Sequence, residues 1–243
     1  MLYRIGALYR YRNPGRTIGI RNSEFHVEHI YKISKDEYNC LQSNSVTSTY
    51  KKANKKIAGR INKLGKKFGK DKGITEKMNI NNTGGCFITL KDHKENFQNN
   101  PKTRLLNPAK NEIGRISKDI LDGINAKLRE TLQLNQWKNT KDVISWFEKI
   151  GNKSRCKFLI FDVKDFYPSI TETLLVNALN FAKQFVTVKK KDFETIMHAR
   201  KSLLYSENVP WMKKSSGIFD VTMGAFDGAE VCELLVYFYF HNS

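Results

Sequence analysis

The stretch Lys157–Ile170 constrains the fold of this chain more than any other segment. Its first part, Phe158–Phe161, is an apolar run typical of a buried strand. The run ends at Asp162, and polar chemistry usually gathers at strand ends in sheet-based folds. An aspartate there is also a common turn former or helix cap. Asp162 alone therefore leaves both a structural and a chemical role open.

A second informative segment lies upstream, where basic residues flank an expected hairpin. Ile88–Lys94 contains Lys91 and Lys94, and Asn100–Pro108 contains Arg104. Arginine can hold a phosphate group by planar bidentate contacts, and lysine acts as a point charge. Two basic elements on one hairpin could therefore close over a triphosphate.

A third segment, Gly217–Glu230, combines glycines with the start of an expected helix. Glycine lets the backbone approach a ligand closely, and Gly224 and Gly228 would allow this.

Between the first and third segments the pattern predicts two helices and a hairpin. Ser169 or Thr171 would cap the first helix, whose apolar positions continue to Phe185. The second would run over 193–204, with apolar positions that include Arg200 in their register. The hairpin would pair 209–212 with 218–221 around a turn at 215–217.

Together these segments resemble the reverse transcriptases (RNA-directed DNA polymerases) of retroelements, in particular the Penelope-like branch. The likeness covers about residues 86 to 240. Asp162 stands where the first catalytic motif begins, and Gly224 stands in the glycine-containing second motif. The chain departs from many polymerases by having Met223-Gly224 in place of Gln-Gly.

The resemblance implies a role for each matching residue. Asp162 would be the catalytic residue and a ligand of Mg²⁺, and Asp165 would lie where backbone amides face the incoming triphosphate. Tyr167 would face the ribose. Phosphates would be bound by Lys91, Lys94 and Arg104, and Gly224 would line the template side. The partners would be an RNA template, a DNA primer and deoxynucleoside triphosphates.

The 243 residues hold no aromatic-x-Asp-Asp motif, which in the family completes a two-Mg²⁺ site. We therefore expect a fragment of a retroelement-derived nucleotidyltransferase that is inactive by itself, with Asp220 or Asp227 as possible substitute carboxylates. A non-catalytic nucleic-acid-binding module, or a relic or incomplete gene model, remains the alternative.

The net charge of +18 and the pI near 9.7 favour a polyanionic partner, nucleic acid before an acidic membrane. The strongest charge run, Tyr50–Lys72, has apolar residues at helical spacing and predicts a basic amphipathic helix. Solvated scaffold and phosphate contact are compatible roles for it. Its candidate nucleic-acid-binding residues are Lys51, Lys52, Lys55, Lys56, Arg60, Lys63, Lys66 and Lys67.

The expected class is α+β: right-hand polymerase fingers and a partial palm (an incomplete ferredoxin-like sheet with packed helices), preceded by a basic helical segment. The divisions are 1–85 for the basic segment, 86–156 for the fingers-like region and 157–243 for the palm. Amphipathic helices are expected at 113–132 and 140–150. We expect Trp137 and Trp146 to be core or helix-packing residues and not base-stacking platforms.

Cellular context is predicted only in outline. The four cysteines are scattered, which favours reduced thiols in an intracellular protein, nuclear or cytoplasmic. The apolar stretch 231–240 is too short to span a bilayer, and no secretory leader is recognised. Arginines at the amino terminus could mimic a targeting peptide, but a start inside a longer protein is favoured. The pattern does not indicate an oligomeric state.

Overall fold

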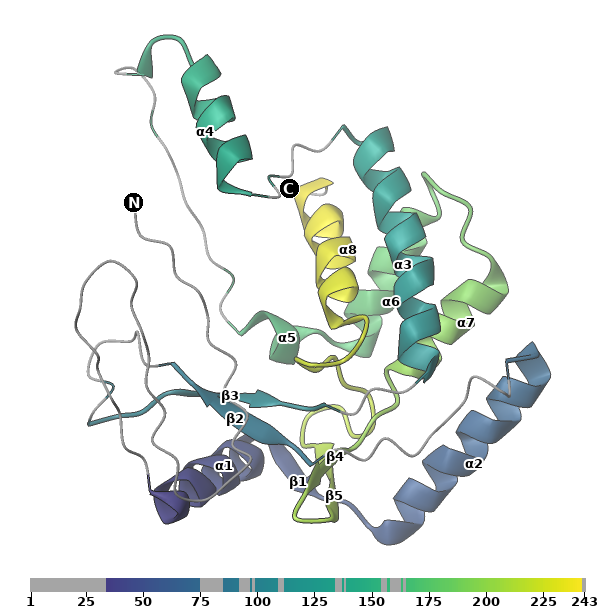
Figure 1. Ribbon diagram of the computed structural model, residues 1–243. Helices are drawn as coiled ribbons and strands as arrows, with labels where there is room; N and C mark the ends of the chain where they lie inside the picture. The colour runs from purple at the N-terminus through teal and green to yellow at the C-terminus, as the bar shows by residue number, and fades with distance from the viewer. Residues whose placement is uncertain are drawn as a thin grey trace.

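The structure is a computed structural model, and it describes residues 34–74, 85–91, 97, 99–108, 112–133, 137, 139–153, 157, 163 and 165–241. Within these residues the fold is α+β, with eight helices and two small antiparallel sheets (Figure 1). The helices are α1 Lys35–Thr49, α2 Lys55–Lys72, α3 Glu112–Thr131, α4 Thr140–Lys149, α5 Phe166–Ser169, α6 Glu172–Ala182, α7 Lys190–Ala199 and α8 Gly228–His241. The strands are β1 Tyr50–Lys52, β2 Phe87–Leu90, β3 Thr103–Leu106, β4 Leu204–Ser206 and β5 Val209–Lys213.

Four helices, α3, α6, α7 and α8, pack around the main hydrophobic core (Figure 1). Leu121 and Leu128 of α3 are fully buried there, as is Leu235 of α8. The predicted capping of α6 is confirmed, because the Thr171 hydroxyl accepts a hydrogen bond from the amide of Leu174. Helix α7 stops at Ala199, so the second predicted helix was drawn too long at its carboxyl end.

The three-stranded sheet has the order β1-β5-β4, so a strand from the basic amino-terminal part pairs with one from the carboxyl-terminal part. Tyr50 lies opposite Lys213, and the Tyr50 hydroxyl donates to the Asp220 carboxylate at 2.7 Å. The regions 1–85 and 157–243 therefore share one sheet. Tyr50–Lys52 also corrects the predicted extent of the basic helix, which begins at Lys55 after its Asn54 cap.

The predicted hairpin between the two helices and the glycine segment was wrong in register. The paired strands are β4 and β5, joined by Glu207 and Asn208. Both turn residues have positive φ, of 51° and 62°, which is the backbone of a type I′ turn. A turn does form before Gly217, but it closes only a single bridge, between Lys213 and Gly217.

The second sheet is the hairpin β2–β3, and α1 covers one of its faces (Figure 1). Ile88 is buried on that side, where its carbonyl and amide lie within hydrogen-bonding distance of the Tyr38 hydroxyl. The Thr103 hydroxyl is also on that side, 2.7 Å from the hydroxyl of Ser45. The hairpin predicted around the upstream basic residues is therefore present.

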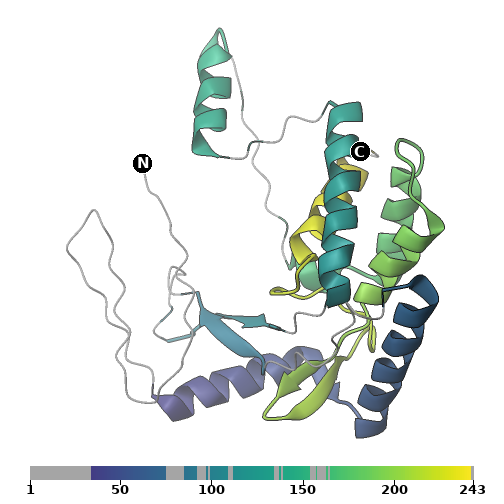
Figure 2. The ribbon, with the colours of Figure 1, turned by 45° about the vertical axis from the view of Figure 1, so that its right-hand side comes forward.

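Helix α4 stands apart from the other helices in both views (Figures 1 and 2). None of its residues is buried. Of the two positions predicted for Trp137 and Trp146, core or helix packing, the core position was wrong, since 46% and 37% of their surfaces are exposed. They pack on each other, with ring centroids 4.8 Å apart.

No helix in the described part of the chain is long and apolar enough to cross a membrane. Cys86 and Cys232 are buried free thiols, and Cys40 is exposed. Cys156 lies outside the described residues.

Candidate functional site

The hairpin β2–β3 presents Arg104 on the face that α1 does not cover. Arg104 lies opposite Thr89, and its side chain is exposed. Side chains alternate along a strand, so Thr103 and Leu105 point to the α1 side while Arg104 points away. Lys91 continues the pairing through its amide, which donates to the Lys102 carbonyl at 2.8 Å. Lys94 lies outside the described residues.

The first motif is described only from its carboxyl-terminal side. Asp162 and most of the predicted strand at 157–162 lie outside the described residues. Asp165 precedes α5 in the left-handed region, with φ 50°, and its side chain makes no capping hydrogen bond. Aspartate is one of the few residues other than glycine that tolerate this conformation. Asp165 is therefore exposed at a sharp turn into α5.

Tyr167 packs against the start of α8. The pKa of its phenol is raised to about 12, chiefly by burial and then by the adjacent Cys232 thiol, to which it hydrogen-bonds. A Cβ added at Gly228 would come within 3.2 Å of the Tyr167 ring, so Gly228 gives the ring its room. The ring is half-buried, and its hydroxyl is engaged by α8.

The loop Thr222–Asp227, here called the glycine loop, packs against the end of β3. The Asn107 amide donates to the Met223 carbonyl at 3.0 Å. Gly224 has φ 98°, and a Cβ there would lie 2.7 Å from the Asn107 carbonyl oxygen. The close approach of the Asn107 backbone is by itself enough to require glycine at position 224. The Asn107 side chain is buried and donates to the Leu203 carbonyl at 3.3 Å.

A buried ion pair closes the other end of the glycine loop. Arg200 and Asp227 are paired, with 1% and 0% of their side chains exposed. Arg200 Nε and Nη1 and Asp227 Oδ2 have no hydrogen-bond partner among the described residues. The sequence signal for this pair was the arginine in the apolar register of the second predicted helix, which was not interpreted as a buried charge. These groups line a small cleft together with Asn107, Ser202 and Thr222.

The two carboxylates considered as substitutes for the missing motif are both held inside the protein. Asp227 is committed to Arg200. Asp220 accepts from the Tyr50 hydroxyl and lies 3.5 Å from the Lys213 ammonium. Burial raises the pKa of Asp220, while the hydrogen bond from Tyr50 and the nearby Lys213 charge oppose that rise.

Mg²⁺ takes oxygen ligands in near-octahedral geometry. The described residues contain no group of three or more His, Cys, Asp or Glu side chains that could hold a metal ion. Asp220 and Asp227 are engaged by cations, and Asp162 lies outside the described residues. The described residues by themselves do not fit a magnesium site.

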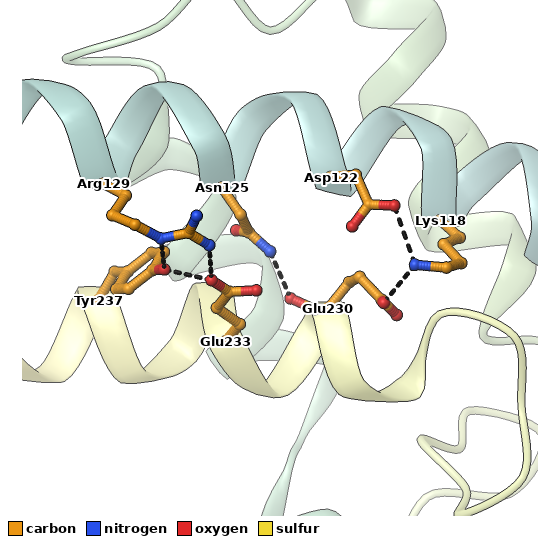
Figure 3. A network of polar contacts seen from close by, with 7 residues as sticks. All are labelled: Lys118, Asp122, Asn125, Arg129, Glu230, Glu233 and Tyr237. Carbon is orange, nitrogen blue, oxygen red and sulfur yellow. Dashed lines mark hydrogen bonds and ion pairs between the residues drawn. The ribbon is translucent and has the colours of Figure 1, made fainter. Parts of the chain in front are cut away.

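Helix α8, which follows the glycine loop, is fixed to α3 by a row of polar contacts. Figure 3 shows the residues of this row: Lys118, Asp122, Asn125, Arg129, Glu230, Glu233 and Tyr237. Lys118 contacts Glu230 at one end, and Arg129 pairs with Glu233 at the other. Between them, Asn125 Nδ2 donates to the Glu230 carbonyl at 2.9 Å. The row holds α8, and with it the glycine loop, in register with α3.

Helix α2 carries a row of cations. Residues spaced alternately four and three apart lie on one face of a helix with 3.6 residues per turn. Five exposed cations follow this spacing and are here called the basic stripe: Lys56, Arg60, Lys63, Lys67 and Lys70. The predicted nucleic-acid residue Lys66 is exposed beside the stripe, Lys55 begins the helix, and Lys51 and Lys52 lie exposed on the edge strand β1.

Near the carboxyl end of α2, its apolar side contacts α7. The Phe68 ring stacks on His198, with centroids 4.3 Å apart and an interplanar angle of 6°. Lys72 pairs with Glu194. These contacts hold the helix so that the basic stripe faces solvent.

Comparison with protein-family models, curated proteins and solved structures found no match to this chain. Its own residues and geometry therefore carry the functional argument.

Proposed function

We propose that this chain is the fingers and part of the palm of a retroelement-derived reverse transcriptase, which binds nucleic acid and does not extend a primer by itself. The observation that carries the proposal is the convergence of three segments far apart in sequence. Gly224 of the glycine loop packs on the end of the hairpin at Asn107, and Gly228, which follows the loop as the first residue of α8, packs on Tyr167 at the turn into α5. In the reverse transcriptase family the corresponding motifs surround the nucleotide.

The charges of the hairpin β2–β3 support a phosphate-bearing ligand. Arg104 is exposed on the open face of the hairpin, and Lys91 lies at the end of β2. A guanidinium on a rigid strand suits bidentate contact with a phosphate. Under the proposal, Arg104 and Lys91 hold phosphates of a nucleotide or of a nucleic-acid backbone.

The carboxylates support binding without catalysis. Two-metal nucleotidyl transfer needs several carboxylates that are free to coordinate metal. Asp220 and Asp227 are bound to Lys213 and Arg200, which leaves Asp162 as the one residue expected at a metal from the resemblance. Binding is accordingly the activity proposed for residues 1–243.

A non-catalytic nucleic-acid-binding module is the second candidate, and the basic stripe favours it. The cations of the stripe are exposed along four turns of one helix, as a contact to a polyphosphate backbone requires. This function would not depend on the convergence at the glycine loop.

Primer extension separates the two candidates from an active enzyme. Purified residues 1–243 with an RNA template, a DNA primer, Mg²⁺ and deoxynucleotides should give no product above background. Extension that disappears in Asp162→Asn would overturn the proposed inactivity, and would mean that another carboxylate completes the site. Asp162→Asn should leave nucleic-acid binding unchanged, because it removes no phosphate contact.

The salt dependence of binding tests the role of the basic stripe. Each phosphate neutralised contributes about −0.7 to −0.9 to the slope of log affinity against log salt. Replacing Lys56, Lys63, Lys67 and Lys70 by Gln should flatten that slope by roughly two to four units if most of them contact phosphates. Glutamine keeps helix propensity, so a change reports charge and not unfolding.

A control variant with the same change in net charge removes four exposed lysines outside α2: Lys127, Lys183, Lys189 and Lys191. Its slope should stay near that of the parent protein. Equal flattening in both variants would show a diffuse effect of net charge and would assign the stripe a scaffold role only.

A further inference from the structure

Helix α4 is amphipathic in sequence but keeps its apolar side chains at the surface. Val143, Ile144 and Phe147 are between 37% and 42% exposed, and no α4 residue is buried. Contiguous exposed apolar surface on a protein usually marks an interaction site. Helix α4 itself lies away from the main helices (Figures 1 and 2).

Three aromatic rings lie in and next to this patch. Trp137 lies just before α4, and its ring contacts that of Trp146 at 4.8 Å with a tilt of 52°. Phe147 follows directly and is 42% exposed. These three rings are here called the aromatic platform. Their flat faces suit another planar ring system, and nucleic-acid bases of any sequence offer one.

The charges around the platform decide between partners. Lys141, Lys149, Lys153 and Lys157 are exposed along the same segment, and the Lys153 ammonium lies 5.4 Å from the Phe147 ring centroid. Of the two acids in α4, Asp142 is engaged in the capping box with Asn139. Lysine is depleted from the cores of protein interfaces. Cations interleaved with exposed aromatic rings are instead the pattern of single-strand binding surfaces.

We propose that the aromatic platform stacks the bases of single-stranded nucleic acid, with Lys149 and Lys153 at the phosphates. The inference goes beyond the proposed function, because it assigns α4 to unpaired bases, whereas the basic stripe of α2 would contact the backbone alone. It shares the nucleic-acid partner with the proposed function, and the two surfaces are distinguished by different measurements.

Tryptophan fluorescence tests the platform directly in the full chain. The chain has three tryptophans, and Trp211→Phe removes the one that lies in the sheet. In this background, an oligothymidylate of about 12 nucleotides should quench the remaining emission, because stacked bases contact Trp137 and Trp146. An oligomer of the same length with abasic sites keeps the phosphates and should leave the emission unchanged.

Paired substitutions separate stacking from charge. Trp137→Ala with Trp146→Ala should weaken oligothymidylate binding roughly 10- to 100-fold and leave the salt slope unchanged. Trp137→Phe with Trp146→Phe keeps a ring at each position and should stay within several-fold of the parent. The abasic oligomer should bind all three proteins alike. The four-lysine variant of α2 should keep the quenching and show a flatter salt slope. The role of either surface can therefore be disproved without affecting the other.

Three results would overturn the inference. The first is an alanine pair that binds oligothymidylate as tightly as the phenylalanine pair. The second is equal quenching by the thymidylate and abasic oligomers. The third is concentration-dependent self-association, measured by sedimentation, that the alanine pair abolishes, since this would make the platform a protein interface.

Discussion

Helices α3 and α4 follow each other along the chain and both carry apolar residues at helical spacing, yet they end in opposite environments. Leu121 and Leu128 of α3 are completely buried against α7 and α8. The corresponding face of α4 is exposed, with Ile144 at 39%. Periodicity thus decides that a segment becomes a helix, while the partners available in three dimensions decide whether its apolar face is covered.

Polar contacts add to this difference in burial between α3 and α4. Helix α3 bears Lys118 and Arg129 at the spacing where α8 offers Glu230 and Glu233, so the pair is held in one register (Figure 3). Helix α4 is stabilised by its own capping box, and Trp146 contacts the ring of Trp137. An interface between helices therefore needs complementary polar residues as well as apolar ones to be specific.

The largest expected effect comes from breaking the ion pair inside the main body. Asp227→Asn leaves the buried Arg200 guanidinium without its counter-charge, and removal of one partner from a buried pair typically costs about 3–5 kcal/mol. Urea unfolding followed by circular dichroism would measure the loss.

Two further variants check this explanation. Asp122→Asn breaks a pair whose side chains are 36% and 52% exposed, and should change the free energy of unfolding by less than about 0.5 kcal/mol. Arg200→Met combined with Asp227→Leu should recover much of the loss, because it also removes the buried donors that lack partners. A double variant no more stable than Asp227→Asn would contradict the account.

The second-largest expected effect comes from truncating an apolar side chain in α3, compared with a similar truncation in α4. Leu128→Ala opens a cavity in the core and should reduce the free energy of unfolding by about 2–5 kcal/mol. Ile144→Ala truncates an exposed side chain and should cost less than about 1 kcal/mol. Chemical denaturation of both variants under identical conditions provides the comparison. Similar losses would mean that the α4 face is covered in solution, as by a second copy of the chain.

The sequence predicted α2, α3, α4, α6 and α7 because each carries apolar residues at helical spacing, with a cap such as Thr171 for α6. It gave no prediction for α1, whose sequence is largely polar and whose buried residue is Val46. It failed at the hairpin β4–β5, whose turn is made by Glu207 and Asn208 with positive φ, without the glycine that such a turn favours. Gly217 favoured a turn at 215–217, so the prediction placed the hairpin turn there and not at Glu207 and Asn208.

The candidate site was predictable only residue by residue. The sequence picked out Arg104, Tyr167 and Gly224, but the contact of Gly224 with Asn107 joins positions more than a hundred residues apart. The Arg200–Asp227 pair was also missed, because the residues next to a buried charge in the sequence do not indicate its partner. Long-range pairing is set by the whole fold, and no local pattern encodes it.

A pair of glycine substitutions sharpens the distinction between local and tertiary requirements. Gly123 lies inside α3, and a Cβ there meets no atom within 4 Å, so Gly123→Ala should stabilise the protein by up to about 1 kcal/mol. Gly224→Ala should destabilise it by about 1–3 kcal/mol, since φ is 98° and the Cβ would collide with Asn107. Thermal melts of the two variants should shift in opposite directions, and a shift of the same sign would count against the geometry of the glycine loop.

The smallest expected effect concerns α2, which is intermediate between α3 and α4 because contacts near its carboxyl end attach it to α7. Burial, aided by the nearby Lys201 charge, lowers the pKa of His198 to about 4, against about 6.5 when unfolded. The folded protein therefore keeps His198 neutral while the unfolded chain takes up a proton between these values. The contribution of His198 to stability is complete above about pH 6.5 and is lost as the pH falls toward about 4.

His198→Phe keeps the ring stacked on Phe68 and removes the titration. Its free energy of unfolding, measured by urea at pH 7.5 and at pH 5, should fall less on acidification than that of the parent protein. The difference cannot exceed about 1.4 kcal/mol per pH unit, and partial solvent exposure of the ring reduces it. The pKa of Glu194 is lowered by its hydrogen bond to Lys72, and this pair is the same in both proteins, so the comparison isolates His198. An identical pH dependence in parent and variant would show that the contact between α2 and α7 is open in solution.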